Sequence, residues 1–82
     1  MELRHLRYFK VLAETLNFTR AAELLHIAQP PLSRQISQLE DELGTLLVAR
    51  ERPLRLTDAG RFFYEQTCTV LQQLQSINDN TR

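Results

Sequence analysis

The sequence has few of the residues that would indicate a disulfide-bonded, disordered or membrane-spanning protein. Its 82 residues include one cysteine, Cys68, which excludes an internal disulfide and a metal site built from several cysteines. Two glycines, three prolines and an ordinary apolar content argue against disorder. No apolar run approaches the roughly 20 residues needed to cross a bilayer, and no secretory signal opens the chain. We therefore expect one small cytoplasmic domain with a reduced thiol and no membrane contact.

The net charge is zero, because ten basic residues balance ten acidic ones. Nucleic-acid-binding domains are often basic, so this balance counts against that function at first sight. The charges are unevenly distributed, however. Basic residues gather in residues 1–37 and 50–56, whereas acids gather at residues 40–42 and towards the carboxy terminus. The sequence predicts a dipolar domain whose basic end is able to bind DNA.

Catalytic and metal-binding patterns are absent too. His5 and His26 lie far apart and lack the spacing of a metal-binding pair, and no glycine-rich loop could hold a phosphate. Glu40, Asp41 and Glu42 are consecutive on a predicted helix, so we expect their side chains to point in three directions into solvent. The sequence predicts no enzyme, no cofactor and no metal site.

A helix-turn-helix pattern occupies residues 18–43. We expect a short helix capped by Thr19, a turn at residues 26–28, and a second helix with Pro30 and Pro31 in its first turn, where proline is tolerated. One apolar stripe follows the second helix at steps of four, three and four, formed by Leu32, Ile36, Leu39 and Leu43.

The opposite face of this second helix is polar, which suits insertion into a DNA major groove. At about 100° per residue it carries Pro30, Arg34, Ser37 and Asp41, flanked by Ser33 and Gln38. Arginine pairs with guanine, glutamine with adenine, and apolar surface with the thymine methyl group. We expect base contacts from Gln29, Pro30, Pro31, Ser33 and Arg34. Contacts to the DNA backbone are expected from Thr19, Arg20, Ser37, Gln38 and Arg50.

Two shorter patterns flank the helix-turn-helix. Residues 3–16 predict a first helix with Leu6, Phe9, Ala13 and Leu16 on one face. Further apolar surface comes from Leu3, Tyr8, Val11 and Leu12, so we expect this helix to contact two partners. Gly44 is placed to end the second helix in a left-handed conformation. Residues 46–56 then predict two very short strands around a charged turn, a wing that brings Arg52, Pro53 and Arg55 to a minor groove. A plain charged loop is the alternative.

The last predicted helix is too long for so small a domain to cover. Thr57 caps it, Asp58 complements its dipole, and a length of about 33 Å follows if it continues to Asp79. We expect its apolar face to pair with a second copy of the chain. The residues of this face are Phe63, Thr67, Val70, Leu71, Leu74 and Ile77.

Three stretches of the sequence resemble the amino-terminal DNA-binding domain of LysR-type transcriptional regulators: MELRHLRYF, FTRAAELLHIAQPPLSRQISQLEDELG and RLTDAG. The resemblance covers essentially the whole chain and is strongest to regulators of aromatic-compound degradation. It implies a mainly all-α winged helix-turn-helix in residues 1–57 and a linker and dimerisation helix in residues 58–82. By the same resemblance, base-reading positions fall on Gln29, Pro30, Ser33 and Arg34, and wing contacts on Arg50 and Arg52.

The resemblance further implies binding to an interrupted inverted repeat in double-stranded DNA. Full-length members add a domain that senses a small molecule, and they usually form tetramers, so an effector response is not expected from these residues alone. The chain departs from the family at Val48 and Ala49, where many members have phenylalanine and an acid. It also has His26 where generic helix-turn-helix turns often have glycine. The alternative function is a winged helix that docks onto a protein, which the zero net charge favours.

Overall fold

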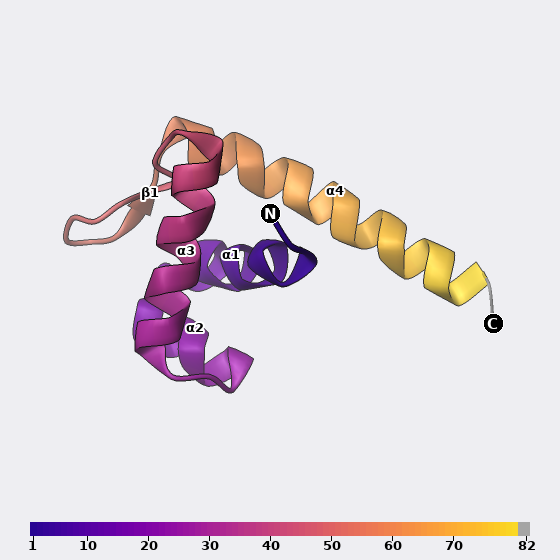
Figure 1. Cartoon of the computed structure of the whole chain (residues 1–82), viewed down its shortest axis with the longest axis horizontal. Helices are drawn as coiled ribbons and strands as arrows, with labels where there is room; N and C mark the ends of the chain where they lie inside the picture. The colour runs from indigo at the N-terminus through magenta and orange to yellow at the C-terminus, as the bar shows by residue number, and fades with distance from the viewer. Residues whose placement is uncertain (81–82) are drawn as a thin grey trace.

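Four helices and a two-stranded hairpin make up the computed structural model, which describes residues 1–80 (Figure 1). The expected mainly helical winged helix-turn-helix is confirmed. Residues 81 and 82, the end of the predicted linker helix, lie outside the described residues. In chain order the elements are α1 (Leu3–Thr15), α2 (Phe18–Leu25), α3 (Gln29–Leu43), β1 (Val48–Ala49), β2 (Arg55–Leu56) and α4 (Asp58–Asn80).

The core lies where α1, α2 and α3 meet. The predicted stripe of α3 is confirmed, because Leu32, Ile36 and Leu39 are fully buried and Leu43 is half-buried. The small Ala21 and Ala22 are buried on α2, where they allow the neighbouring helices to approach closely. The remaining buried apolar residues are Phe9, Leu12, Leu47 and Val48.

The apolar face predicted for α1 is only partly buried. Phe9 is buried as expected, but its buried companions are His5 and Leu12. Leu6 and Ala13 are only half-buried, and Leu16 is 37% exposed. Two causes explain the shift: α1 contacts α2, α3 and α4 together, and Leu16 lies beyond the helix end in a left-handed conformation with φ of 50°.

A polar cap begins α2, and left-handed residues end both α2 and α3. The predicted Thr19 cap is wrong, because α2 begins at Phe18 and its N-cap is Asn17, whose Oδ1 accepts a hydrogen bond from Arg20 N at 2.9 Å. His26 ends α2 with φ of 59°, a conformation that costs a non-glycine residue about 1 kcal/mol. Gly44 ends α3 as predicted, with φ of 71°.

Helix α4 is attached tightly to the segment that precedes the wing. The predicted Thr57 cap is confirmed, since Thr57 Oγ1 accepts from Gly60 N at 2.9 Å. The same hydroxyl donates to Leu46 O at 2.6 Å, and Thr57 N donates to Leu47 O at 3.0 Å. Gly60 is buried here, and a Cβ atom at this position would overlap the carbonyl oxygen of Leu47.

Only the first half of α4 packs against the rest of the domain. The Phe63 ring meets Phe9 edge to face at 5.4 Å between centroids, and Thr67 is 1% exposed. The second half of α4 extends past the end of the helical body (Figure 1), and most of its residues up to Asn80 are exposed. Within residues 1–80, no helix is both long and apolar enough to span a membrane.

Replacing Gly60 with alanine is expected to lower the free energy of unfolding by about 3 kcal/mol, the upper end of overpacking penalties. Alanine favours helix over glycine by roughly 0.5–1 kcal/mol, so a destabilisation would have to come from the clash. Gly44→Ala is the control, because a Cβ there meets nothing within 4 Å and carries only the left-handed penalty. Denaturant titration measures both variants. A Gly60→Ala variant as stable as the wild type would contradict the contact with Leu47.

Candidate nucleic-acid interface

The outer face of α3 carries the predicted base-reading residues on a firmly packed helix. Pro30 and Arg34 are exposed, whereas Gln29, Pro31 and Ser33 are half-buried. The buried stripe on the opposite side fixes the rotation of the helix, so Arg34 points away from the core leucines. Together with Ser33, Ser37, Gln38 and Asp41, Arg34 lines a surface hollow of about 350 Å³.

The first turn of α3 has few free backbone donors. Its N-cap is Ala28, which provides no side-chain hydrogen bond, and the two prolines follow within the first turn. Proline has no N–H, so two of the donors that a helix start normally leaves unpaired are removed. The side chain of Gln29 bonds to the next turn instead, donating from Nε2 to Ser33 Oγ at 2.7 Å.

The predicted backbone contacts on α2 and α3 are placed at the surface. Thr19 and Arg20 are exposed in the first turn of α2, where Arg20 lies 4.0 Å from Glu23 in a weak ion pair. Ser37 and Gln38 are exposed on the second half of α3. These residues are available to a ligand, and their DNA contacts stay a prediction.

The wing is a hairpin, so the alternative of a plain charged loop is excluded. β1 and β2 pair antiparallel, with Val48 opposite Leu56 and Ala49 opposite Arg55. The hairpin projects from the helical body in Figure 1, and Arg52 and Pro53 are exposed in its turn. Arg55 is also exposed, and its Nε donates to Glu51 Oε2 at 3.1 Å.

Glu40 is buried, which corrects the expectation that all three consecutive acids of α3 are solvated. Only 5% of the residue is exposed. Its Oε2 accepts hydrogen bonds from the backbone N–H groups of Leu47 at 2.8 Å and Val48 at 3.2 Å. Its Oε1 accepts from Arg50 Nη1 at 3.1 Å. The signal for this burial was its position, one turn beyond Ile36 and next to Leu39 on the apolar stripe.

Arg50 is partly committed to contacts within the domain. Besides the ion pair with Glu40, its guanidinium lies 5.7 Å from the centre of the Phe18 ring, and Nη2 is 3.5 Å from Ser37 Oγ. Its side chain remains 42% exposed. Arg50 therefore joins the end of β1 to α2 and α3, and its predicted contact with the DNA backbone stays a prediction.

The predicted dimer face of α4 divides into two parts. Thr67 is 1% exposed, so the prediction that it faces a second copy is wrong. Phe63 is half-buried and its ring meets Phe9 of α1, and its contact with a second copy stays a prediction. Val70, Leu74 and Ile77 remain 40%, 37% and 60% exposed, and Leu71 is half-buried. The exposed part of the face is the outer half of the helix.

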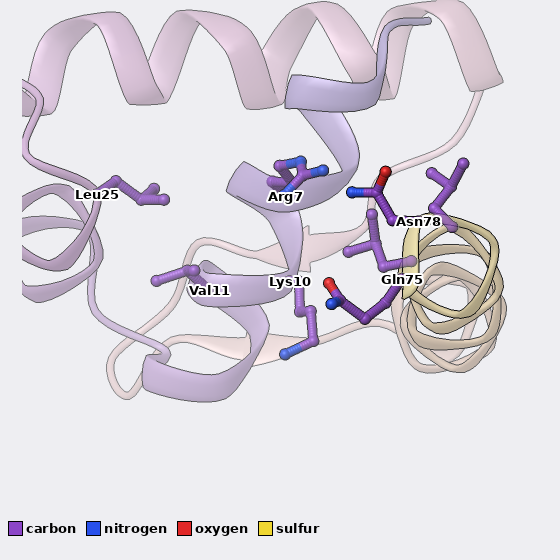
Figure 2. Close-up of a pocket in the computed structure, with 8 residues that line it drawn as sticks. Arg7, Lys10, Val11, Leu25, Gln75 and Asn78 are labelled. Atoms are coloured by element: carbon purple, nitrogen blue, oxygen red, sulfur yellow. The ribbon is translucent and has the colours of Figure 1, made fainter. Parts of the chain in front are cut away.

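A groove of about 420 Å³ adjoins this outer half, between α1 and α4 (Figure 2). Leu71 and Leu74 form its α4 wall together with Gln75 and Asn78, and Arg7 and Lys10 of α1 lie opposite. Val11 of α1 and Leu25 of α2 add apolar surface. The groove is therefore mixed, with apolar side chains, amides and two basic residues.

Glu14 connects α1 to α4 by hydrogen bonds. Its Oε2 accepts from Lys10 Nζ at 2.9 Å and from Tyr64 OH at 2.7 Å. The hydrogen bonds from Lys10 and Tyr64 hold the pKa of Glu14 below its ordinary value of 4.5. The bond with Glu14 raises the pKa of Tyr64, because ionising the phenol would remove the donor. At neutral pH Glu14 is therefore ionised and Tyr64 protonated, which preserves the hydrogen bond between α1 and α4.

The two histidines lie at helix ends and have structural roles there. His5 is buried, and its Nδ1 accepts from Glu2 N at 3.1 Å at the start of α1, while His26 forms the turn after α2. Across residues 1–80, no group of three or more His, Cys, Asp or Glu side chains could hold a metal ion.

Comparison with known proteins identifies the family. Residues 3–61 match the model of the bacterial regulatory helix-turn-helix proteins of the lysR family. The chain belongs to this family.

Its relatives are longer proteins. The chain is 92% identical over 82 residues to the regulator CatR of Pseudomonas putida, covering all of this chain and 28% of CatR. It is 49% identical over 83 residues to BenM of Acinetobacter baylyi, covering all of this chain and 27% of BenM. The chain thus spans little more than a quarter of these LysR-family relatives.

Solved LysR-family structures share the fold. A complex of the BenM DNA-binding domain with benA site 1 DNA has a TM-score of 0.96 and 50% identity, covering 99% of this chain and 92% of that one. A complex of the CbnR DNA-binding domain with DNA has a TM-score of 0.94 and 40% identity, covering 100% and 95%.

The departures from the LysR-family pattern are accommodated locally. Val48 is fully buried in the core, so a smaller residue than phenylalanine still anchors the wing. Ala49 pairs with Arg55 and needs no side-chain partner. His26 takes the left-handed conformation, and Ile27 N closes the turn by donating to Ala22 O at 3.0 Å.

Replacing Glu40 with alanine is expected to lower the free energy of unfolding by roughly 2–4 kcal/mol, because two backbone N–H groups and the Arg50 guanidinium lose their acceptor. Asp41→Ala is the matched control: Asp41 is the exposed neighbour, and surface changes usually stay within about 0.5 kcal/mol. Denaturant titration of both variants measures the difference. Equal stabilities would show that the carboxylate does not anchor the wing.

Proposed function

We propose that this LysR-family domain binds specific sites in double-stranded DNA and serves to regulate transcription, with no catalytic activity. The observation that carries the proposal is the exposed polar face of α3, centred on Arg34, on a helix whose other side is fixed in the core. The BenM and CbnR domains, which were solved in complex with DNA, support it because they share this fold at 40–50% identity.

In the proposed complex the amino-terminal half of α3 lies in the major groove. Arg34 donates to guanine O6 and N7, Gln29 meets an adenine edge, and the prolines contact a thymine methyl group. The flanking hydroxyl, amide and basic groups bind phosphates and hold the domain in register. These are the side chains of Thr19, Arg20, Ser37, Gln38 and the exposed part of Arg50. The wing brings Arg52, Pro53 and Arg55 to the adjacent minor groove.

A second copy of the chain is proposed to pair through the outer half of α4. The support is the apolar surface left open by Val70, Leu74 and Ile77, beside the groove lined by Leu71. Two-fold pairing would place two α3 helices in successive major grooves of an interrupted inverted repeat, about one or two turns apart. Tetramers and a small-molecule response would belong to the longer protein, and the site of action would be the cytoplasm, where bacterial DNA lies.

The second candidate function is docking onto a protein, which the net charge of zero favours. Salt dependence separates the two candidates. Neutralised phosphates release counterions, so DNA affinity falls steeply as salt rises, whereas docking between surfaces of balanced charge changes little.

Replacing Arg34 with alanine is expected to weaken binding to a selected operator by about 1–3 kcal/mol and to relax the preference for guanine, because the bidentate donor is lost. Arg34→Lys is the matched control, since lysine keeps the charge without the planar fork. Mobility shifts on operator and random duplexes at several salt concentrations measure both effects. Equal weakening on random DNA would refute a base-reading role, and binding without salt dependence would favour protein docking.

Replacing Val70 and Leu74 together with glutamate is expected to give folded monomers with much weaker operator affinity, because charge is placed on the exposed apolar face. Gln72→Glu with Ser76→Glu is the control, adding the same charge to the opposite, exposed face of α4. Analytical ultracentrifugation reports the oligomeric state, and circular dichroism reports the fold. An unchanged dimer in the Val70 and Leu74 variant would remove this face from the interface.

A further inference from the structure

Asp41 is an exposed acid on the face of α3 assigned to DNA binding. It follows Arg34 by two helical turns, so it points in nearly the same direction about 10 Å further along the helix. It borders the hollow of about 350 Å³ that contains Arg34 and a second hollow of about 440 Å³ that contains Arg50. The carboxylate therefore lies between the arginine assigned to base reading and an arginine assigned to the DNA backbone.

The charge of Asp41 is not neutralised within the domain. Its neighbour Glu40 pairs with Arg50. Its other neighbour, Glu42, pairs with the amino group of Met1. Asp41 itself has no ion pair and no side-chain hydrogen bond with any of residues 1–80. A full negative charge is therefore presented to solvent on this face.

This charge does not stabilise the helix that carries it. Asp41 lies in the last turn of α3, where the carbonyl ends of the peptide dipoles disfavour a negative charge. The described helix has no basic residue in that turn to compensate. The carboxylate thus has no stabilising role in the fold, and its effect is expected on a ligand that approaches this face.

Phosphate groups are the part of a duplex that would come nearest to Asp41. Ser37 and Gln38, which are assigned to the DNA backbone, lie one turn earlier, and side chains three and four residues apart are neighbours on a helix surface. A phosphate bound by either side chain would lie within about 8 Å of the Asp41 carboxylate. Two like charges about 4–8 Å apart in water repel enough to weaken binding by about 2- to 6-fold.

We propose that Asp41 repels the phosphates beside α3 and thereby lowers the affinity of the domain for duplexes of any sequence. The inference rests on the proposed DNA binding and adds a residue that opposes it. Because phosphates carry no sequence information, the repulsion leaves the preference between base sequences unchanged. Asp41 offsets part of the positive charge on the DNA-facing surface, in a chain whose net charge is zero.

The first experiment compares three single substitutions with the wild type. Asp41→Asn removes the charge with little change in shape, and Asp41→Glu retains the charge. Glu65→Gln is the remote control, because it removes one negative charge from an exposed residue of α4, which packs mainly against α1. Mobility shifts on a selected operator and on a random duplex, at several salt concentrations, measure the affinities. Thermal denaturation confirms that each variant is folded.

Asp41→Asn is expected to bind both duplexes about 2- to 6-fold more tightly at low salt, with an unchanged ratio between the two affinities. The gain should shrink as salt rises, because exposed charges are screened over about 10 Å at 0.1 M ionic strength. Asp41→Glu and Glu65→Gln should bind like the wild type.

A second experiment locates the repelled phosphate. Operator duplexes in which one phosphate at a time is replaced by a neutral methylphosphonate are bound to the wild type and to Asp41→Asn. At the phosphate beside Asp41, the neutral replacement should reduce the gain that Asp41→Asn gives, whereas replacements elsewhere should leave it intact. The coupling between the two changes measures the repulsion.

Three results would overturn the inference while leaving DNA binding intact. An unchanged or lower affinity of Asp41→Asn for both duplexes would show that the carboxylate does not repel phosphates. A change confined to the operator would show that Asp41 contacts a base. An equal gain in Glu65→Gln would show an effect of overall charge. A wild-type domain that binds no duplex at low salt would instead refute the proposed function, so the two failures are distinguished.

Discussion

The carboxylate of Glu40 attaches the wing to α3. Two strands of two residues each cannot stabilise a hairpin by themselves. Glu40 accepts two backbone N–H groups at the start of the hairpin and pairs with Arg50 at the end of β1. Arg50 in turn meets Phe18 at the start of α2. The start of the wing is thus bonded to α3 through one buried acid, and the position of the wing relative to the recognition helix depends on it.

Much of the fold was predictable because its determinants are local. The spacing of Leu32, Ile36 and Leu39 fixes which side of α3 is buried, and Gly44 and Thr57 mark helix ends through backbone conformation and capping. The errors arose where neighbours in space decide. Glu40 and the solvated Asp41 are consecutive acids on α3; Glu40 lies beside the apolar stripe, and the backbone donors of the following loop complete its burial. The start of α2 was misplaced because Asn17 and Thr19 are both good caps.

The candidate site follows the same division. Exposure of Arg34 and Pro30 is a consequence of the buried stripe, so it could be predicted from periodicity alone. The bond between Gln29 and Ser33 has the ordinary spacing of helix neighbours, but its formation is visible only in the structure. On α4, the periodicity predicts the apolar face but not what covers it: Phe63 meets Phe9 of α1 and Thr67 is buried, whereas Val70, Leu74 and Ile77 stay exposed. The apolar stripe of α4 therefore packs inside the domain along the first half of the helix and is exposed along the outer half.

Helix α4 is uninterrupted from Asp58 to Asn80, and Gly60 in its first turn contacts Leu47. Its outer leucines are consequently in fixed rotational phase with the wing and with α3. Each residue added or removed after Thr67 would turn the outer stripe by about 100° and move it by about 1.5 Å. The number of residues between Gly60 and the outer apolar stripe therefore sets how a second domain would be oriented relative to the first.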